Sequence, residues 1–197
     1  MTVPSDKSAI REKNLAQRMH LAPASHAAWS RTCCEQIYDL ICALAASNNA
    51  IIGGYAPIKA ELDVMPVLRK LAKDSHIIAL PVMEKEAGKR QLIFHPWKPG
   101  EKLTPKTYGI HEPDRHSAPV IPDIVIVPLL AFDRRGHRVG YGGGHYDVML
   151  RKLRVVKPDA LTIGAAFSQQ EEALLPDNAY DERLSRIVTE KEVIVIR

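Results

Sequence analysis

The chain contains little cysteine and no long apolar run. Three of its 197 residues are cysteines, and Cys33, Cys34 and Cys42 all fall in one helix-like stretch without the spacing of a metal site. We therefore expect reduced thiols packed in the core of a cytoplasmic protein. No apolar run approaches the roughly 18 residues of a membrane span. The first residues are polar and the segment after Lys7 is amphipathic, so we expect neither a signal peptide nor a membrane anchor.

The overall composition is that of an ordinary globular protein. Hydrophobic residues make up 46% and charged residues 25% of the sequence. A chain of this length can bury one substantial core, so we expect a single domain over residues 1–197. The net charge is +4 and the isoelectric point is near 9.0. These values suit an anionic ligand or nucleic acid, but the basic residues are spread along the chain instead of forming a stripe with interleaved aromatics. A phosphate-bearing small molecule is therefore favoured.

One stretch, residues 124–150, shows the clearest organisation. Residues 124–127 are a β-branched run fenced by Pro122 and Pro128, which predicts a strand buried on both faces of a mostly parallel sheet. A charged turn and the glycine run 140–144 follow, and a helical pattern extends over residues 146–153. A strand, a glycine-rich loop and a helix start form a geometry that holds phosphates.

The physical reason lies in the backbone at the helix start. Unpaired N–H groups and a partial positive charge attract an anion there, and glycines remove the Cβ atoms that would keep it away. The loop matches neither a P-loop nor a dinucleotide fingerprint. A glycine run alone would favour a solvated connector. Arg138 as a guanidinium fork, Tyr146, and Asp147 as a possible magnesium ligand favour a phosphate site instead.

Helical and strand patterns alternate along the rest of the chain. This alternation predicts an α/β protein, a single three-layer α/β/α domain with a mostly parallel central sheet, Rossmann-like in arrangement. We expect Pro81 to close the second strand and the segment 169–186 to be irregular. The expected helices cover residues 6–21, 25–46, 64–73 and 146–153, and the expected strands residues 50–55, 77–80, 91–95, 124–127, 161–167 and 193–196.

Charged residues mark two places where a ligand would be expected. Lys7, Arg11 and Arg18 fall on one side of the first helix, which is usually a solvated face. Glu61 and Asp63 follow the first strand, and ligands of open α/β sheets lie beyond the carboxyl ends of the strands. Asp63 is well placed to cap the next helix. Glu61 has no such structural role.

The glycine loop and its flanks resemble a known family. Their spacing is similar to the signature of the 5-formyltetrahydrofolate cyclo-ligases, also called 5,10-methenyltetrahydrofolate synthetases. The matching residues are Phe132-Asp133, Gly136, Arg138, Gly140, Gly142, Gly144 and Tyr146-Asp147. Further matches, in the family's order, are Lys7, Arg11, residues 61–63, residues 108–110, Glu112-Pro113, Asp181 and residues 187–190. One departure is His145, where the family has the first of two adjacent aromatics.

The resemblance implies an activity and a set of residue roles. The activity is ATP- and Mg²⁺-dependent cyclisation of 5-formyltetrahydrofolate to 5,10-methenyltetrahydrofolate, through phosphorylation of the formyl oxygen and attack by N10. Implied ATP-binding residues are Lys7, Arg11, Arg138, Gly140, Tyr141, Gly142, Gly143, Gly144, His145 and Tyr146, with Arg138 and Tyr146 also catalytic. Implied substrate-binding residues are Ala56, Glu61, Tyr108, Tyr141 and His145, and implied magnesium ligands are Asp147 and Asp181. The resemblance leaves Arg18 on the solvated face.

Two rival interpretations stay open at this stage. The first is a relative of the same fold that binds ATP or a phosphorylated metabolite but acts on another substrate, which would not need both Glu61 and Tyr108. The second is a nucleic-acid-binding module on the same fold, whose binding would fall steeply with salt. We expect a monomer with a small-molecule partner, and neither a nucleic-acid nor a membrane partner.

Overall fold

The strand predicted at residues 124–127 is the fourth of the seven strands in the main sheet. The computed structural model describes residues 6–45, 49–86, 89–106, 109–114 and 117–197. Within these residues the sheet order is β11-β10-β9-β6-β1-β2-β3, and β3 and β11 pair antiparallel at the two edges while the inner strands are parallel. The strands are β1 (Ile51–Gly53), β2 (Ile77–Glu86), β3 (Lys89–Pro96), β6 (Ile124–Pro128), β9 (Leu161–Ala165), β10 (Arg186–Val188) and β11 (Val193–Val195).

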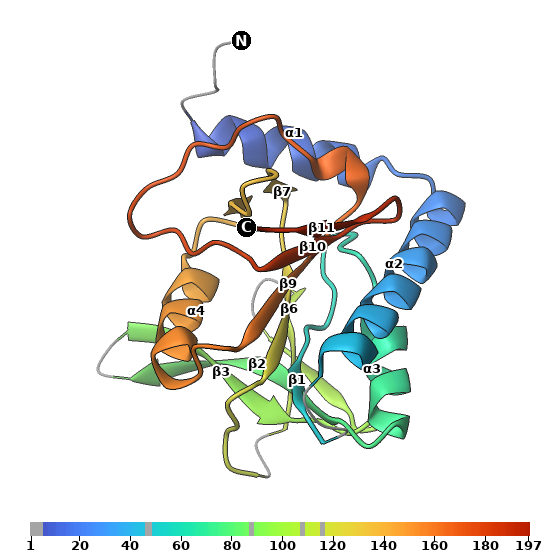
Figure 1. Ribbon diagram of the computed structural model, residues 1–197, viewed down its shortest axis with the longest axis vertical. Helices are drawn as coiled ribbons and strands as arrows, with labels where there is room; N and C mark the ends of the chain where they lie inside the picture. The colour runs from blue at the N-terminus through green and yellow to red at the C-terminus, as the bar shows by residue number, and fades with distance from the viewer. Residues whose placement is uncertain (1–5, 46–48, 87–88, 107–108, 115–116) are drawn as a thin grey trace.

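Helices cover both faces of this sheet, as predicted. On β6, Ile124 and Ile126 point into one core, and Val125 and Val127 point into the other. The first core lies under α2 (Pro23–Leu44) and α3 (Met65–Lys73), and the second under α4 (His145–Val156). Figure 1 shows the resulting arrangement, with α2 and α3 on one side of the sheet and α4 on the other. The α/β/α layers and the mostly parallel sheet are confirmed.

The first helix, α1 (Lys7–Met19), crosses the end of the sheet beyond β6 (Figure 1). Asp6 caps it, because its side chain accepts a hydrogen bond from the Ser8 amide at 2.8 Å. Ile10 packs with residues of the short hairpin β7 (Ala131–Phe132) and β8 (Arg138–Val139) that follows β6. Through this contact, α1 lies directly against the chain that leads into the glycine loop.

The order of the parallel strands locates a crevice. Read across the sheet, they run β2-β1-β6-β9-β10, so the chain moves outward in opposite directions from β1 and from β6. Loops after such neighbouring strands diverge, and ligands of doubly wound sheets bind in the space between them. Here those loops are residues 54–64, which carry Glu61, and residues 129–130, which lead to the glycine loop.

Two strand predictions were wrong. Pro81 does not close β2, which continues to Glu86 and pairs with β3 along the way. Pro81 removes no ladder hydrogen bond, because the amide of Met83, two residues on, points away from β3 to the Glu112 carboxylate. No strand was predicted between residues 168 and 192. The structure has one there, β10, which begins at the last residue of the segment 169–186 and pairs with β9 and β11. Such a short strand is stabilised by its neighbours more than by its own sequence.

The remaining elements follow the predictions closely. Helix α2 begins at Pro23, where a missing N–H is no loss. Cys33 is buried on its core face, whereas Cys42 and Leu44 are exposed. The prediction that the last turn of this helix packs in the core was therefore wrong. All three cysteines, which lie on this described helix, are free. The small elements are β4 (Leu103–Pro105), β5 (His111–Pro113) and η2 (Ser168–Gln170).

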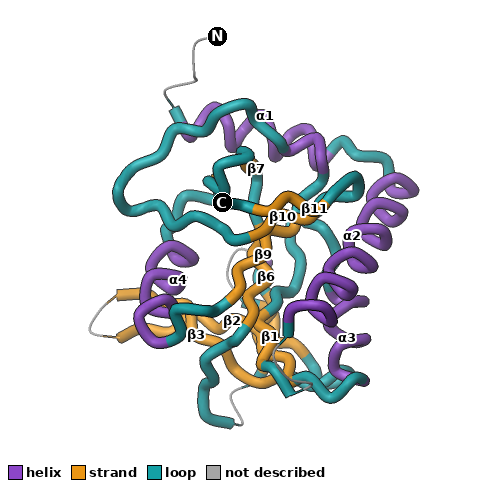
Figure 2. Tube along the Cα trace, in the orientation of Figure 1, coloured by secondary structure: helices purple, strands orange, loops and turns teal. Residues whose placement is uncertain are grey.

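Long loops connect the elements near α1 and α4. Figure 2 shows the segment after η2 as a continuous loop before it reaches β10. Contacts place this loop along both helices, because Lys13 on α1 pairs with Glu172 and Arg151 on α4 pairs with Glu182. In the described part of the chain, no helix has the length and apolar character needed to cross a membrane. The cytoplasmic location stays a prediction from cysteine usage.

Candidate functional site

The glycine loop connects β8 to α4. Gly144 caps α4 with a φ of 65°, a left-handed conformation that suits glycine. The guanidinium of Arg11 lies against the loop, since its Nε donates to the Gly140 carbonyl at 2.9 Å. A Cβ atom on Gly142 would stand 3.4 Å from the Arg11 Cζ atom. Helix α1 therefore places Arg11, one of its two predicted phosphate-binding residues, on the loop itself.

His145 opens α4 and covers its neighbour in the loop. A Cβ atom on Gly143 would lie 2.7 Å from Cδ2 of the imidazole, so no larger residue fits there while His145 holds this position. The ring packs over loop backbone and is partly buried. The contacts of His145 with ATP and the folate stay predictions.

Two ion pairs join the predicted cations to the predicted magnesium ligands. Arg138 donates to Asp147 Oδ1 at 2.8 Å, and Lys7 pairs with Asp181 Oδ2 at 2.5 Å. Arg138 is 9% exposed. Burial lowers the pKa of Arg138, whereas the charges of Asp147 and Asp181 oppose that shift, so both carboxylates act on one guanidinium. The four charged residues thus form one cluster at the start of α4.

The two aspartates are suited to a magnesium site that is completed by water and phosphate, and not to a metal site closed by protein side chains alone. Asp147 Oδ1 also accepts from the Glu182 amide, and Asp181 Oδ2 accepts from the Asn178 amide. The second oxygen of each carboxylate has no hydrogen bond within the described residues. No group of three or more His, Cys, Asp or Glu side chains suitable for a metal occurs there either. Magnesium keeps several waters and often takes one or two carboxylates plus substrate phosphates, so this pair fits it.

Glu61 lies buried in a tight turn after β1. The residue is only 5% exposed. Its Oε2 accepts a hydrogen bond from the Ile58 amide at 2.9 Å, and its own amide donates to the Ile58 carbonyl at 2.8 Å. Burial raises the pKa of Glu61 to about 7, against the opposing effects of the Ile58 amide and the Arg18 charge. In the described chain no cation lies within ion-pair distance of this carboxylate. Such a group costs stability, which favours a functional reason for it.

The two central residues of this turn have left-handed backbones. Lys59 has a φ of 45° and Ala60 a φ of 56°, as in a type I′ turn built without glycine or asparagine. Each such residue costs on the order of 1 kcal/mol. His26 on α2 stabilises the turn, because its Nε2 lies 3.3 Å from the Ala60 carbonyl oxygen and 3.0 Å from that of Glu61. Strained backbone held from outside is typical of functional sites.

Arg18 is buried, so its predicted place on a solvated face was wrong. It is 1% exposed and donates to the carbonyls of Lys59 at 3.2 Å and Leu129 at 3.1 Å. It also donates to the hydroxyl of Tyr141, the partly exposed tyrosine of the glycine loop. Arg18 shares a helix side with Lys7, but this spacing does not show whether that side is covered. Its burial depended on which elements cover that side.

Tyr146 connects the two halves of the candidate site. The pKa of Tyr146 is raised by burial and by the Glu61 charge, and Arg138 opposes that rise. The charges of Glu61 and Arg138 therefore both act on the Tyr146 phenol. Ala56 lies in the same loop as Glu61 and is partly buried. Tyr108, the remaining predicted folate contact, lies outside the described residues.

With the site assembled, comparisons with known proteins identify the family. A family model described as the 5-formyltetrahydrofolate cyclo-ligase family matches residues 3–190. The chain belongs to this family. The resemblance recognised in the loop residues is thus confirmed over nearly the whole length of the protein.

Relatives and solved structures of the cyclo-ligase family extend the comparison. The 5-formyltetrahydrofolate cyclo-ligase of Escherichia coli K12 is 34% identical over 138 residues, which are 68% of this chain and 74% of that protein. The Mycolicibacterium smegmatis enzyme of the same name is 26% identical over 198 residues, covering 98% and 97%. The solution structure of Aquifex aeolicus 5,10-methenyltetrahydrofolate synthetase superposes with a TM-score of 0.76 at 28% identity, covering 97% of this chain and 93% of that one.

A second solved structure supports the fold alone. The 5,10-methenyltetrahydrofolate synthetase of Mycoplasma pneumoniae superposes with a TM-score of 0.72 at 23% identity, covering 94% of this chain and 99% of that one. The α/β architecture of this cyclo-ligase family member is therefore shared with solved synthetases along most of its length.

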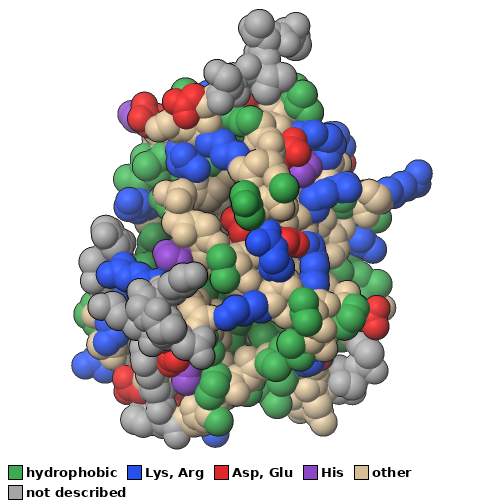
Figure 3. Space-filling model, turned by 90° about the vertical axis from the view of Figure 1, so that its left-hand side faces the viewer, with side chains coloured by type: hydrophobic (Ala, Val, Ile, Leu, Met, Phe, Trp, Pro, Cys, Tyr) green, Lys and Arg blue, Asp and Glu red, His purple; other side chains and the backbone are tan. Residues whose placement is uncertain are grey.

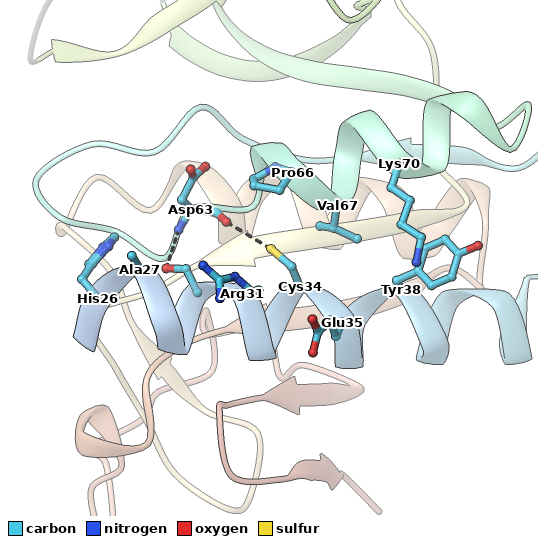
Figure 4. Close-up of a pocket in the computed structure, with 11 residues that line it drawn as sticks. His26, Ala27, Arg31, Cys34, Glu35, Tyr38, Asp63, Pro66, Val67 and Lys70 are labelled. Atoms are coloured by element: carbon cyan, nitrogen blue, oxygen red, sulfur yellow. Dashed lines mark hydrogen bonds between the residues drawn. The ribbon is translucent and has the colours of Figure 1, made fainter. Parts of the chain in front are cut away.

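One groove in this cyclo-ligase family member lies away from the glycine loop. It has a volume of about 490 Å³ and runs between α2 and α3 (Figure 4). Asp63 borders it and accepts from the amide of Met65, the first residue of α3, at 3.0 Å, whereas the N-cap of the helix is Val64, one residue later than predicted. None of the predicted site residues lines the groove, and its charged residues Arg31, Glu35 and Lys70 are of both signs. We assign it no ligand.

The surface of the α4 side carries charges of both signs. In Figure 3, lysine and arginine side chains are spread over this face with acidic and hydrophobic side chains between them, instead of forming one continuous stripe. Arg151 and Arg154 on α4 both pair with Glu182. The absence of a nucleic-acid partner stays a prediction. The monomeric state stays a prediction.

Proposed function

We propose that the protein converts 5-formyltetrahydrofolate and ATP to 5,10-methenyltetrahydrofolate, ADP and phosphate. One observation supports this beyond family membership. Arg138 and Lys7 at the glycine loop lie beside a second centre, the buried carboxylate of Glu61, and Tyr146 connects the two. A cationic loop for a triphosphate next to a buried acceptor for a heterocycle is the arrangement that this reaction needs.

The chemical difficulty is the leaving group. Ring closure requires the formyl oxygen to depart, and an amide-like oxygen leaves poorly. In the proposed reaction this oxygen attacks the γ-phosphoryl group of ATP, and ADP is released. N10 then attacks the activated carbon, and the oxygen departs as phosphate. The protein must align the two substrates and neutralise charge on the phosphoryl oxygens.

The charge cluster is suited to that neutralisation. Lys7, Arg11 and Arg138 would contact phosphate oxygens, together with the amides of the glycine loop. Asp147 and Asp181 would hold magnesium, which supplies further positive charge at the phosphates when it is bound. Binding then exchanges partners within the cluster. The cations leave the carboxylates for phosphates, and no buried charge is left unpaired.

The Glu61 side would bind the folate. The 2-amino-4-oxo edge of a pterin presents adjacent N–H donors, and a carboxylate accepts two such bonds in parallel. Tyr141 would contact the ring from the glycine loop, and Ala56, His145 and Tyr108 would complete the contacts. Tyr146, near Glu61 and Arg138, would stand where the formyl oxygen and γ-phosphate meet. No serine or cysteine nucleophile is needed.

The decisive experiment follows the methenyl chromophore. Full-length protein is mixed with MgATP and 5-formyltetrahydrofolate, and absorbance is recorded against samples lacking ATP or magnesium. We expect product only when all components are present. Binding of ATP without product from this folate would instead support the relative with another substrate. A salt-sensitive gel shift with nucleic acid, and no product, would support the binding module.

A further inference from the structure

Arg18 joins three segments that the sequence keeps far apart. Its Nε donates to the Lys59 carbonyl in the Glu61 turn, and its Nη1 to the Leu129 carbonyl after β6. Its Nη2 donates to the hydroxyl of Tyr141 in the glycine loop. The first two segments are the loops that diverge at the crevice between β1 and β6, and the third is the nucleotide loop. One guanidinium, supplied by α1, therefore fixes their relative positions.

The bonding of Arg18 is unusual for a buried cation. The side chain is almost fully buried, yet in the described part of the chain no carboxylate lies within ion-pair distance of it. Neutral carbonyls and a phenol oxygen receive its hydrogen bonds instead. A buried guanidinium without a paired anion is expensive, and burying Glu61 without a paired cation is expensive too. Each lies close enough to influence the other electrostatically but not to form a closed pair.

In the described chain this arrangement leaves the Glu61 carboxylate without a bonded cation, and its contacts are the Ile58 amide and the Tyr141 hydroxyl. A direct ion pair would use the oxygens that a ligand needs, whereas a cation held nearby by carbonyls favours the charged carboxylate without occupying it. Arg18 also holds Tyr141. Its hydroxyl accepts a hydrogen bond from Arg18, and the centre of its ring lies 5.9 Å from Arg18 Cζ and 5.1 Å from Lys59 Nζ, while 41% of the residue stays exposed.

We propose that Arg18 is a positioning residue for the folate: it holds the Tyr141 ring and the Glu61 turn in one fixed arrangement and places a positive charge near the Glu61 carboxylate that binds the pterin. The proposal rests on the proposed function, because it names the residue that prepares the folate side of that same site. Arg18 itself does not contact the substrate. It acts through Tyr141 and Glu61.

The charge of Glu61 depends on groups from several elements. Burial is the main effect on its pKa, and Arg18 is the cation from α1 that opposes it. Other titratable or charged groups face the turn from the remaining elements. They are Tyr55 and Lys59 from the same loop, His26 from α2, Tyr141 from the glycine loop and Tyr146 from α4.

Three variants separate the charge of Arg18 from its geometry. Arg18→Met removes both, and Arg18→Lys keeps the charge but loses the planar fork. Lys13→Met is the matched control, because Lys13 lies on the same helix and pairs with Glu172 at the surface. Each variant is checked for folding by circular dichroism. The pH profile of kcat/KM for 5-formyltetrahydrofolate is then measured at saturating MgATP.

The variants should give distinct profiles. Arg18→Met should lower kcat/KM at pH 7 by at least about tenfold, as expected for a lost buried charge, and move the acidic limb upward by about one pH unit. Arg18→Lys should lower kcat/KM several-fold but leave the limb in place. Lys13→Met should resemble the wild type. An unmoved limb in Arg18→Met, or the same loss in Lys13→Met, would overturn the proposal.

A second measurement is independent of turnover. The Glu61 carboxyl carbon is followed by ¹³C NMR between pH 5 and 9, with Glu61→Gln used to assign its signal. We expect its titration at higher pH in Arg18→Met than in the wild type and an unchanged midpoint in Lys13→Met. If the wild type makes no methenyl product, the proposed function fails while this titration still decides whether Arg18 controls Glu61. If Arg18→Met does not fold, Arg18→Lys must show reduced kcat/KM with an unmoved limb, and a wild-type profile would refute the proposal.

Discussion

Arg138 and Asp147 form a partly buried ion pair of 2.8 Å across the glycine loop. One residue comes from the strand before the loop and the other from the first turn of the helix after it. In the proposed function they serve different ligands, phosphate and magnesium. Their pairing gives each of the two charges a partner in the absence of ligands. A single ligand would leave one of the two charges without a partner, which is costly in a buried site.

Removing either member of this pair should slow the reaction. We expect Arg138→Ala and Asp147→Asn each to lower methenyl formation by at least about tenfold through lost stabilisation of transition-state charge. Initial rates at saturating MgATP and folate provide the measurement. Arg134→Ala is the matched control, because Arg134 pairs with Glu171 and Glu192 at the exposed end of the molecule. Equal rates in all three variants would contradict the roles assigned to the pair.

Asp181 should matter chiefly for magnesium. We expect Asp181→Asn to raise the Mg²⁺ concentration for half-maximal rate by about tenfold, a free-energy change of about 1.4 kcal/mol, because one of two carboxylates is lost. Lys7 pairs with Asp181 in the structure. Lys7→Met should instead weaken ATP binding in calorimetry, because the proposed contact of Lys7 with a phosphate is lost. If Asp181→Asn leaves the magnesium dependence unchanged, Asp181 is only the ion-pair partner of Lys7.

Gly140 offers a direct test of the phosphate loop. Its φ is not positive, and a Cβ atom there would meet nothing within 4 Å. Gly140→Ala should therefore change the unfolding free energy by no more than about 0.5 kcal/mol. We expect ATP binding to weaken by about tenfold all the same, because the methyl group occupies space intended for phosphate. Unchanged ATP affinity would count against a phosphate at this position.

Gly136 provides the contrasting variant. It has a φ of 88°, and a Cβ atom would stand 2.9 Å from the Leu184 carbonyl oxygen. Gly136→Ala should destabilise the fold by about 2 kcal/mol through strain and collision, with ATP affinity of the folded fraction preserved. Thermal unfolding and calorimetry together distinguish the two glycines.

Glu61 should make stability depend on pH. Its folded-state pKa of about 7 lies above its ordinary value of 4.5, so its proton stabilises the folded chain. That contribution is fully present below pH 4.5 and is lost as the pH rises through 7. Glu61→Gln should therefore be more stable than the wild type at pH 8 by on the order of 2 to 3 kcal/mol, with the difference shrinking toward pH 5.

Urea unfolding at both pH values measures this difference, and the same variant should lose folate-dependent turnover. A substitution that increases stability and abolishes activity would indicate that the buried carboxylate is retained for function. A wild type and variant of equal stability at pH 8 would show that Glu61 is not held charged in a buried site.

The sequence by itself determined the central strand, the glycine loop and the α/β class. Residues 124–127 are β-branched throughout, and only a strand covered on both faces accommodates such a run. Glycines that need left-handed backbones at a helix start likewise leave few alternatives. These are local signals, read within ten or fifteen residues, and the family resemblance rested on the same residues.

Tertiary structure alone decided the rest. Whether Arg18 faced solvent or the crevice depended on α1 lying across the end of the sheet, and no pattern within the helix states that. Strand β10 and the continuation of β2 through Pro81 depended in the same way on neighbouring strands. Burial and pairing are properties of two surfaces that meet, so one segment of sequence encodes only half of each.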